Sequence, residues 1–242
     1  MYAQITYFYR RKMSLINDFL SLIYPRQCSA CNRLLYAHET HLCNLCAVSL
    51  PRSGFEGQRN NELELIFAGR VPVEAATSFL LFEKTGRVQQ VLHKIKYHGG
   101  KDLAQELGKM YGRELAGQAS LGELHMIIPI PLYPKKLKER GFNQSEAFAI
   151  GLSEALNIPV RNDLLLRKSA TATQTRKKKF ERWENVEGVF ELTKPDELVN
   201  KHVLLVDDVI TTGATIDAAW QCMKIVEGLK ISLASIAYAQ KF

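Results

Sequence analysis

Two acids and three threonines gather in one short stretch of the chain, HVLLVDDVITTGATI, residues 202–216. An apolar run that suits a buried strand ends at Asp207 and Asp208, and a threonine-rich turn follows directly. Two adjacent carboxylates repel each other unless a cation or hydroxyl groups lie against them. The backbone N–H groups of a turn that opens a helix favour an anion such as phosphate. We therefore expect the stretch to hold one phosphorylated sugar, with its hydroxyls at the acids and its phosphate at the turn.

The turn itself is the predicted phosphate loop. Its glycine tolerates a backbone conformation that other residues resist, and a helix is expected to begin directly after it. A plain capped helix is the alternative, but it does not require two acids and three threonines together. The residues of the predicted loop are Val209, Ile210, Thr211, Thr212, Gly213, Ala214 and Thr215.

Other nucleotide-binding motifs do not explain the acidic strand. A P-loop needs a glycine five positions before its Gly-Lys pair, and neither Gly100-Lys101 nor Gly108-Lys109 has one. In a phospho-receiver domain the acidic pair opens the domain, whereas Asp208 lies near the end of this 242-residue chain. The dinucleotide pattern G-x-G-x-x-G is absent.

Four cysteines form a second constellation near the start of the chain. Cys28 and Cys31 make one C-x-x-C pair, and Cys43 and Cys46 make another. Two such turns bring four thiolates around one ion, which is typical of a structural zinc site with no open coordination position. Two disulfides are the alternative, and a reducing compartment disfavours them. A module this small would draw its folding free energy from the metal.

The remaining potential ligands near this cluster are histidines. His38 and His41 lie between the two cysteine pairs, either as solvated side chains or as substitute ligands. Cys222 stands in the amphipathic stretch AAWQCMKIV and is expected to be a packed thiol.

Strands alternating with helices must position the acidic site. Nearly all-apolar strands between helices predict an α/β fold with a parallel sheet flanked by helices. Ligands of such sheets bind beyond the carboxyl ends of the strands, where the acidic pair stands. We expect strands at 71–83, 125–132, 203–208 and 231–239, and helices at 86–99, 102–115, 143–157 and 214–228. The first helix should bury Val88, Val91, Leu92 and Ile95, and Asn143 should cap the third.

Composition bounds the remaining possibilities. We expect a zinc-binding module and linker at 13–60 and the larger domain at 70–242, with 51–70 read as linker. No apolar run approaches the roughly 20 residues of a membrane span, and no signal-peptide core is present, so we expect a cytoplasmic protein without membrane insertion. A net charge of +7 fits a phosphate-rich partner, although mild basicity also occurs without one.

The motifs resemble a known family. VLLVDDVITTGAT is similar to the 5-phosphoribosyl-1-diphosphate (PRPP) signature of type I phosphoribosyltransferases. The four-cysteine module, IPIPLYPKKLKERGFNQSE and RKSATATQTRKKKFERWENVEGVF, in this order, resemble the ComF family, known in DNA uptake during competence. The resemblance covers nearly the whole chain from about Phe19. It implies a type I phosphoribosyltransferase-like fold with a small N-terminal zinc module.

The resemblance also implies roles for the acids and for a second loop. Asp207 and Asp208 would be catalytic and would contact the ribose hydroxyls, directly or through Mg²⁺. A loop at 131–141 would hold the diphosphate and its Mg²⁺, with Arg140 in the matched RGFNQ. The basic residues before it offer further charge or form a solvated turn; they are Lys135, Lys136 and Lys138.

Further positions match the family outside these two loops. The stretch RKSATATQTRKKKFER resembles a mobile loop that covers the active site, and its matched residues include Arg167, Gln174 and Arg182. Lys96 matches a family position and is either a ligand contact or a surface lysine.

Two functions remain open on these grounds. The first is a PRPP-binding protein that handles incoming single-stranded DNA, with a competence helicase and a DNA-loading protein as partners. Its support is the basic charge and the run Lys177–Lys179, while Phe180 and Trp183 are either stacking groups or core contacts. The second is a Mg²⁺-dependent phosphoribosyltransferase acting on an unknown nitrogenous acceptor, for which no residue can be assigned. A purine or pyrimidine salvage enzyme is disfavoured by the appended zinc module.

Overall fold

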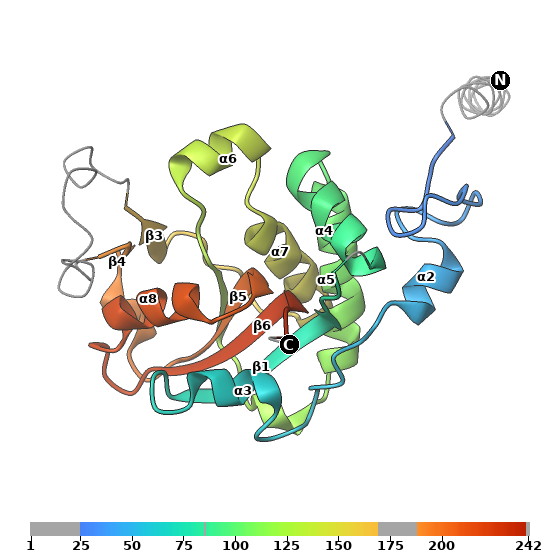
Figure 1. Cartoon of the computed structure of the whole chain (residues 1–242). Helices are drawn as coiled ribbons and strands as arrows, with labels where there is room; N and C mark the ends of the chain where they lie inside the picture. The colour runs from blue at the N-terminus through green and yellow to red at the C-terminus, as the bar shows by residue number, and fades with distance from the viewer. Residues whose placement is uncertain (1–24, 85, 169–187, 241–242) are drawn as a thin grey trace, which may run out of the picture. The chain divides into compact units, whose positions relative to one another are not determined.

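The computed structural model describes residues 25–84, 86–168 and 188–240 (Figure 1). The chain divides into two compact units, residues 1–50 and residues 51–242. In the described part of the chain no helix is long and apolar enough to cross a membrane.

The first unit is built around its cysteines. Helix α2 (Asn44–Ser49) begins directly after Cys43 and carries the buried Cys46. The Glu39 side chain, only 5% exposed, accepts hydrogen bonds from the backbone N–H groups of Asn44 and Tyr36, each at 2.8 Å. These two hydrogen bonds lower the pKa of Glu39, so its carboxylate ties the loop between the cysteine pairs in its charged form.

Four parallel strands form the central sheet of the second unit, in the order β1-β6-β5-β2. Their bounds are Val73–Leu81 for β1, Met126–Pro129 for β2, His202–Ile210 for β5 and Lys230–Tyr238 for β6. Because all four strands run in one direction, their carboxyl ends meet at one edge, where β5 delivers its acidic pair. The expected parallel α/β fold is confirmed.

Helices cover the two faces of this sheet. Figure 1 shows α4 (Arg87–Tyr97), α5 (Lys101–Leu115) and α7 (Gln144–Leu156) on one side and α3 (Glu62–Phe67) and α8 (Ala214–Met223) on the other. The four residues predicted to face inward from α4 are all buried, and the Asn143 side chain caps α7 by accepting from Ser145 N.

Two glycines allow α5 and α7 to pack very closely. A Cβ atom at Gly108 would lie 2.2 Å from the Phe148 carbonyl oxygen, and one at Gly151 would lie 2.0 Å from that of Gln105. Only residues without a side chain fit this crossing. The crossing holds α7, and with it Ser145 at the start of that helix, against the sheet.

The segment expected as a linker is instead folded into the larger unit. Asn61 caps α3 by accepting from Leu63 N and Glu64 N, each at 3.0 Å. Leu63 and Phe67 are fully buried against the sheet and α8. The polar composition of residues 51–70 did not indicate this short amphipathic helix, because only two of the six residues of α3 are buried.

Two further elements differ from expectation around the predicted diphosphate loop. Residues Pro134–Arg140 form a short helix, α6, where a loop was expected, with proline at its start and Gly141 in the left-handed conformation at its end. Strands β3 (Leu165–Arg167) and β4 (Phe190–Leu192) pair as an antiparallel hairpin. The expected mobile loop, including Gln174 and Arg182, lies mostly outside the described residues.

Candidate functional site

The two predicted acids stand at the carboxyl end of β5 and have different partners. The Ser145 hydroxyl, at the start of α7, donates to Asp207 Oδ1 at 3.2 Å. The same oxygen accepts the backbone N–H of Asp208 at 2.8 Å. The Nζ of Lys96, from α4, lies 3.0 Å from Asp208 Oδ2. Helices α4 and α7 and strand β5 therefore meet at the acidic pair, and α4 contributes the sequence-predicted Lys96.

Burial and like charge shape the protonation of this pair. Burial, followed by the neighbouring charge of Asp208, raises the pKa of Asp207 to about 7. The hydrogen bonds from Asp208 N and Ser145, and the charge of Lys96, oppose that rise. Asp207 therefore holds a proton more readily than an ordinary aspartate, and a cation brought between the two acids would favour its charged form.

The phosphate loop is exposed to solvent and ends at a glycine. Thr211 and Thr212 are exposed, and Gly213 adopts a left-handed backbone with φ of 77° immediately before α8. The N–H groups of the first turn of this ten-residue helix point out of its N-terminus, as anion binding requires. Phe67 packs below, since a Cβ atom at Gly213 would lie 2.5 Å from its Cε1.

Arg70, from the segment that was expected to be a linker, connects the same loop to α3. Arg70 Nη2 donates to the Thr212 carbonyl oxygen at 3.2 Å, and its Nε donates to the Ile66 carbonyl oxygen at 3.1 Å. Arg70 Nη1 also forms an ion pair with Asp217 in the first turn of α8. These bonds join α3, the loop and α8, so Arg70 positions the loop rather than facing a ligand with a free guanidinium.

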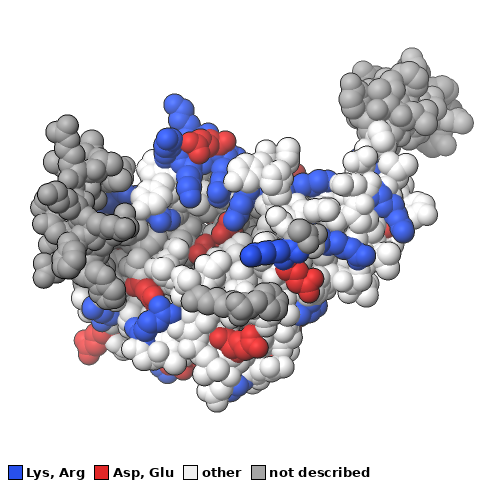
Figure 2. All heavy atoms as spheres, viewed as in Figure 1, with Lys and Arg blue, Asp and Glu red and all other residues white. Residues whose placement is uncertain are grey.

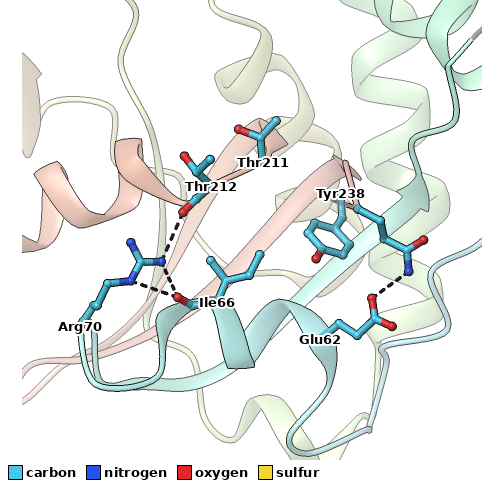
Figure 3. Close-up of a pocket in the computed structure, with 7 residues that line it drawn as sticks. Glu62, Ile66, Arg70, Thr211, Thr212 and Tyr238 are labelled. Atoms are coloured by element: carbon cyan, nitrogen blue, oxygen red, sulfur yellow. Dashed lines mark hydrogen bonds between the residues drawn. The ribbon is translucent and has the colours of Figure 1, made fainter. Parts of the chain in front are cut away.

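A pocket opens beside this arginine (Figure 3). It has a volume of about 620 Å³ and shares two threonines with the phosphate loop. Neither acid of β5 lines it, so the pocket and the acidic pair are separate features joined by the loop. The lining residues are Glu62, Ile66, Arg70, Thr211, Thr212, Tyr238 and Gln240.

Helix α6 carries the sequence-predicted Arg140. Its Nη1 donates to the Gln144 side chain oxygen at 2.8 Å, and its guanidinium lies 6.0 Å from the centre of the Tyr97 ring at the end of α4. Figure 2 shows basic side chains crowded over α6. Arg140 is thus placed between α6 and α4, on the same side of the sheet as Lys96.

Arg167 links the β3–β4 hairpin to the segment that precedes α6. Its guanidinium lies 3.7 Å from the centre of the Tyr133 ring and 5.0 Å from that of Phe190. Its Nη1 donates to the Pro131 carbonyl oxygen at 3.4 Å. In this structure Arg167 therefore anchors the hairpin, and its predicted companions Gln174 and Arg182 lie outside the described residues.

Sequence reasoning missed three residues that build this site. Ser145 could have been noticed, because it lies two residues after the Asn143 cap, inside the matched RGFNQS stretch. Phe67 and Arg70 had no such signal, since they sit in a polar segment and act across the fold.

The four predicted cysteines do come together in the first unit. Their sulfur atoms all lie within 4.8 Å of one another, and neither intervening histidine belongs to the group. Cys31 Sγ and Cys43 Sγ are 3.8 Å apart, which matches the edge, about 3.8 Å, of a tetrahedron with Zn–S bonds of about 2.3 Å. The cysteines are free thiols in the structure. This donor set could hold a metal ion.

Comparisons with known proteins agree with the geometry. The phosphoribosyl transferase domain family matches residues 143–241, from the cap of α7 to just past β6. Competence protein F of Haemophilus influenzae is 39% identical over 92 residues, which are 38% of this chain and 40% of that protein. DNA utilization protein YhgH of Escherichia coli K12 is 30% identical over 129 residues, covering 52% of this chain and 56% of that protein. The chain thus spans about half the length of these two relatives.

A third relative matches over a longer stretch. Competence protein ComFC of Bacillus subtilis is 26% identical over 202 residues, covering 81% of this chain and 77% of that protein. The competence-named relatives and the matched domain together support a ComF-family protein with a phosphoribosyltransferase domain. The acidic pair and the phosphate loop lie within the residues that match the phosphoribosyl transferase domain. Among solved structures, the glutamine PRPP amidotransferase of Bacillus subtilis, complexed with ADP and GMP, has a TM-score of 0.43 at 18% identity. The aligned residues make up 60% of this chain and 30% of the amidotransferase chain, a likeness too weak to carry an argument.

Proposed function

We propose that this ComF-family protein binds PRPP between the acidic pair of β5, the phosphate loop and Arg140. The observation that carries the proposal is the meeting of Asp207, Asp208 and the exposed Thr211–Thr212 turn at the carboxyl edge of one parallel sheet. The 5-phosphate would accept hydrogen bonds from the turn and from the N-terminus of α8. The ribose hydroxyls would lie at the two acids, and Lys96 and Arg140 would face the diphosphate.

The proposed function includes two metal sites, one at the acidic pair and one at the four cysteines. Asp207 and Asp208 would hold Mg²⁺ together with PRPP, and the ion would supply positive charge against the diphosphate. Zn²⁺ would be held by Cys28, Cys31, Cys43 and Cys46 as a structural ion, because four thiolates leave no position open for water. The residues of the chain bind and orient: Ser145 fixes the Asp207 carboxyl, and Arg70 and Phe67 keep the phosphate loop in place.

We further propose that the protein acts in DNA uptake and handles incoming single-stranded DNA in the cytoplasm. Support comes from the names of the relatives, competence protein and DNA utilization protein, and from the net charge of +7. A competence helicase and a DNA-loading protein are the partners that we propose for this role. Transfer of phosphoribose to a nitrogenous acceptor is the competing function, and diphosphate release separates the two.

Calorimetry with PRPP and Mg²⁺ tests the first proposal. The wild type should bind, and the variant Asp207→Asn/Asp208→Asn should lose at least tenfold in affinity. The control Asp102→Asn/Asp196→Asn removes the same charge from two exposed acids and should bind like the wild type. No binding by the wild type, or equal loss in both variants, would contradict a PRPP site here. Release of diphosphate from the same samples would favour an active transferase.

A further inference from the structure

The pocket beside Arg70 has features of a ligand site that PRPP binding does not use. Its volume of about 620 Å³ lies within the range of small-molecule sites, about 300–1,000 Å³. It is built from α3, the turn after β5 and the end of β6 (Figure 3). The segment 131–141, proposed for the diphosphate, follows β2, which lies on the other side of β5 from β6. A ligand in this pocket would therefore lie beside PRPP and away from its diphosphate.

A buried phenol without a partner faces this pocket (Figure 3). Tyr238 is only 6% exposed, and its ring packs on that of Phe55, with 5.8 Å between the ring centres. Within residues 25–84, 86–168 and 188–240, its hydroxyl has no hydrogen-bond partner. Burial, and after it the charge of Glu62, raises the pKa of Tyr238, so the hydroxyl stays protonated at neutral pH. A buried hydroxyl costs free energy unless it is hydrogen-bonded, and a ligand that bonds to it would remove that cost.

A carboxylate faces the same space from α3. Glu62 Oε2 accepts a hydrogen bond from the neutral amide Nε2 of Gln240 at 2.7 Å. In the described part of the chain, Glu62 Oε1 has no hydrogen-bond partner. The other charged residue of the lining, Arg70, is already paired with Asp217 and bonded to two carbonyl oxygens. The lining therefore offers one uncompensated negative charge, which favours N–H donors and disfavours an anion.

We infer that this pocket binds a small nitrogenous ring through its N–H groups, with Glu62 as their acceptor and the Tyr238 hydroxyl bonded to a ring nitrogen. The two exposed threonines of the phosphate loop would add hydroxyl contacts. Ile66 lies between Arg70 and Tyr238 (Figure 3), and its apolar side chain suits the flat face of an aromatic ring better than a hydroxyl-covered sugar. The inference adds a second ligand, and it rests on the proposed function only for the PRPP on the other side of the loop.

Three related rings test the role of the N–H groups. Purine, adenine and 2,6-diaminopurine share one ring system and carry no, one and two amino groups. Titrations followed by saturation-transfer NMR, near neutral pH and without PRPP, should show wild-type affinity rising along this series. Orotate, a planar anion of similar size, should bind about tenfold or more weakly than 2,6-diaminopurine, because Glu62 repels it. Binding of none of the purines, equal affinity for all three, or tight binding of orotate would overturn the inference.

Paired variants test the two polar side chains. Glu62→Gln removes the charge but keeps the shape, and should weaken 2,6-diaminopurine binding roughly 10- to 150-fold, the range for a hydrogen bond to a charged group. Tyr238→Phe keeps the buried ring and should weaken binding about 2- to 10-fold. The controls lie outside the pocket: Asp102→Asn, an exposed acid in the first turn of α5 as Glu62 is in α3, and Tyr97→Phe. Both controls should bind like the wild type, and a control that loses as much as its paired variant would contradict the assignment.

Failure of this site and failure of the PRPP site would give different results. Glu62→Gln and Tyr238→Phe should keep wild-type PRPP affinity in calorimetry with Mg²⁺, because neither side chain belongs to the acidic pair or to the phosphate loop. Asp207→Asn/Asp208→Asn should lose PRPP and still bind 2,6-diaminopurine. Loss of both ligands in Glu62→Gln would show that Glu62 only supports the loop, against the inference. Glu62 is exposed and Tyr238→Phe removes only a hydroxyl, so both variants should fold.

Discussion

Lys96 Nζ lies 3.0 Å from Asp208 Oδ2 and bridges α4 to the end of β5. Both side chains are largely buried, at 25% and 17% exposure. The charge of Lys96 also opposes the rise in the pKa of Asp207. One lysine therefore stabilises two adjacent carboxylates before any ligand arrives, and a cation that comes with the ligand would have to share or replace its contact.

Removal of Lys96 should leave the repulsion between the two carboxylates without a compensating positive charge. We expect Lys96→Gln to lower the free energy of unfolding by roughly 1–3 kcal/mol at pH 8, because a partly buried carboxylate loses its charged partner. Chemical denaturation at pH 8 measures the loss. The control Lys109→Gln breaks an ion pair of similar length with Glu154, whose side chains are 43% and 49% exposed, and should cost less than about 1 kcal/mol. Equal losses would show that Lys96 acts as an ordinary surface lysine.

The raised pKa of Asp207 predicts a pH-dependent stability. Its pKa is about 7 in the folded protein against an ordinary 3.8, so the folded state holds the proton more tightly than the unfolded state. The contribution of this group to stability therefore falls as pH rises between these two values. Asp207→Asn should raise the melting temperature at pH 8, in buffer with EDTA, and raise it much less near pH 4.5. A variant that gains as much at pH 4.5 as at pH 8 would contradict the burial argument.

The glycine of the phosphate loop should tolerate no side chain. Gly213→Ala places a Cβ in a left-handed backbone, which costs about 1–2 kcal/mol, and 2.5 Å from Phe67 Cε1. The loop must shift to relieve that contact, so we expect PRPP affinity by calorimetry to fall at least tenfold. Gly117→Ala separates the two causes, because Gly117 has φ of 81° and open space around its Cβ position. It should lose stability by the backbone cost alone and keep its PRPP affinity.

The cysteine unit should bind one metal ion through four thiolates. Purified protein reconstituted with Co²⁺ should show the intense visible absorption of a tetrahedral thiolate site, with about one ion per chain. Cys31→Ser should reduce both the absorption and the metal affinity, because it leaves three thiolates. Cys222→Ser is the control: burial raises the pKa of the Cys222 thiol, which donates to the Ala219 carbonyl, and its loss should leave metal content unchanged. Equal metal loss in both variants would reject the four-cysteine assignment.

The sequence alone determined the parts of the protein whose signals are local. The two C-x-x-C turns, the apolar strand ending in Asp207 and Asp208, and the buried face of α4 each follow from spacing or periodicity within a few residues. Local geometry decides such features, so they can be read without knowing the fold. The order of strands and helices then indicated a parallel sheet with the acids at its carboxyl edge.

Only the tertiary structure decided which distant residues support the acids and the loop. Phe67 and Arg70 come from a segment whose polar composition resembles a linker, yet they hold Gly213 and Thr212 from more than a hundred residues away in the chain. Likewise, helix α6 buries none of its residues, and only the fold brings its Arg140 close to the Tyr97 ring at the end of α4. Such relationships depend on packing between elements, and sequence spacing carries no information about which elements meet.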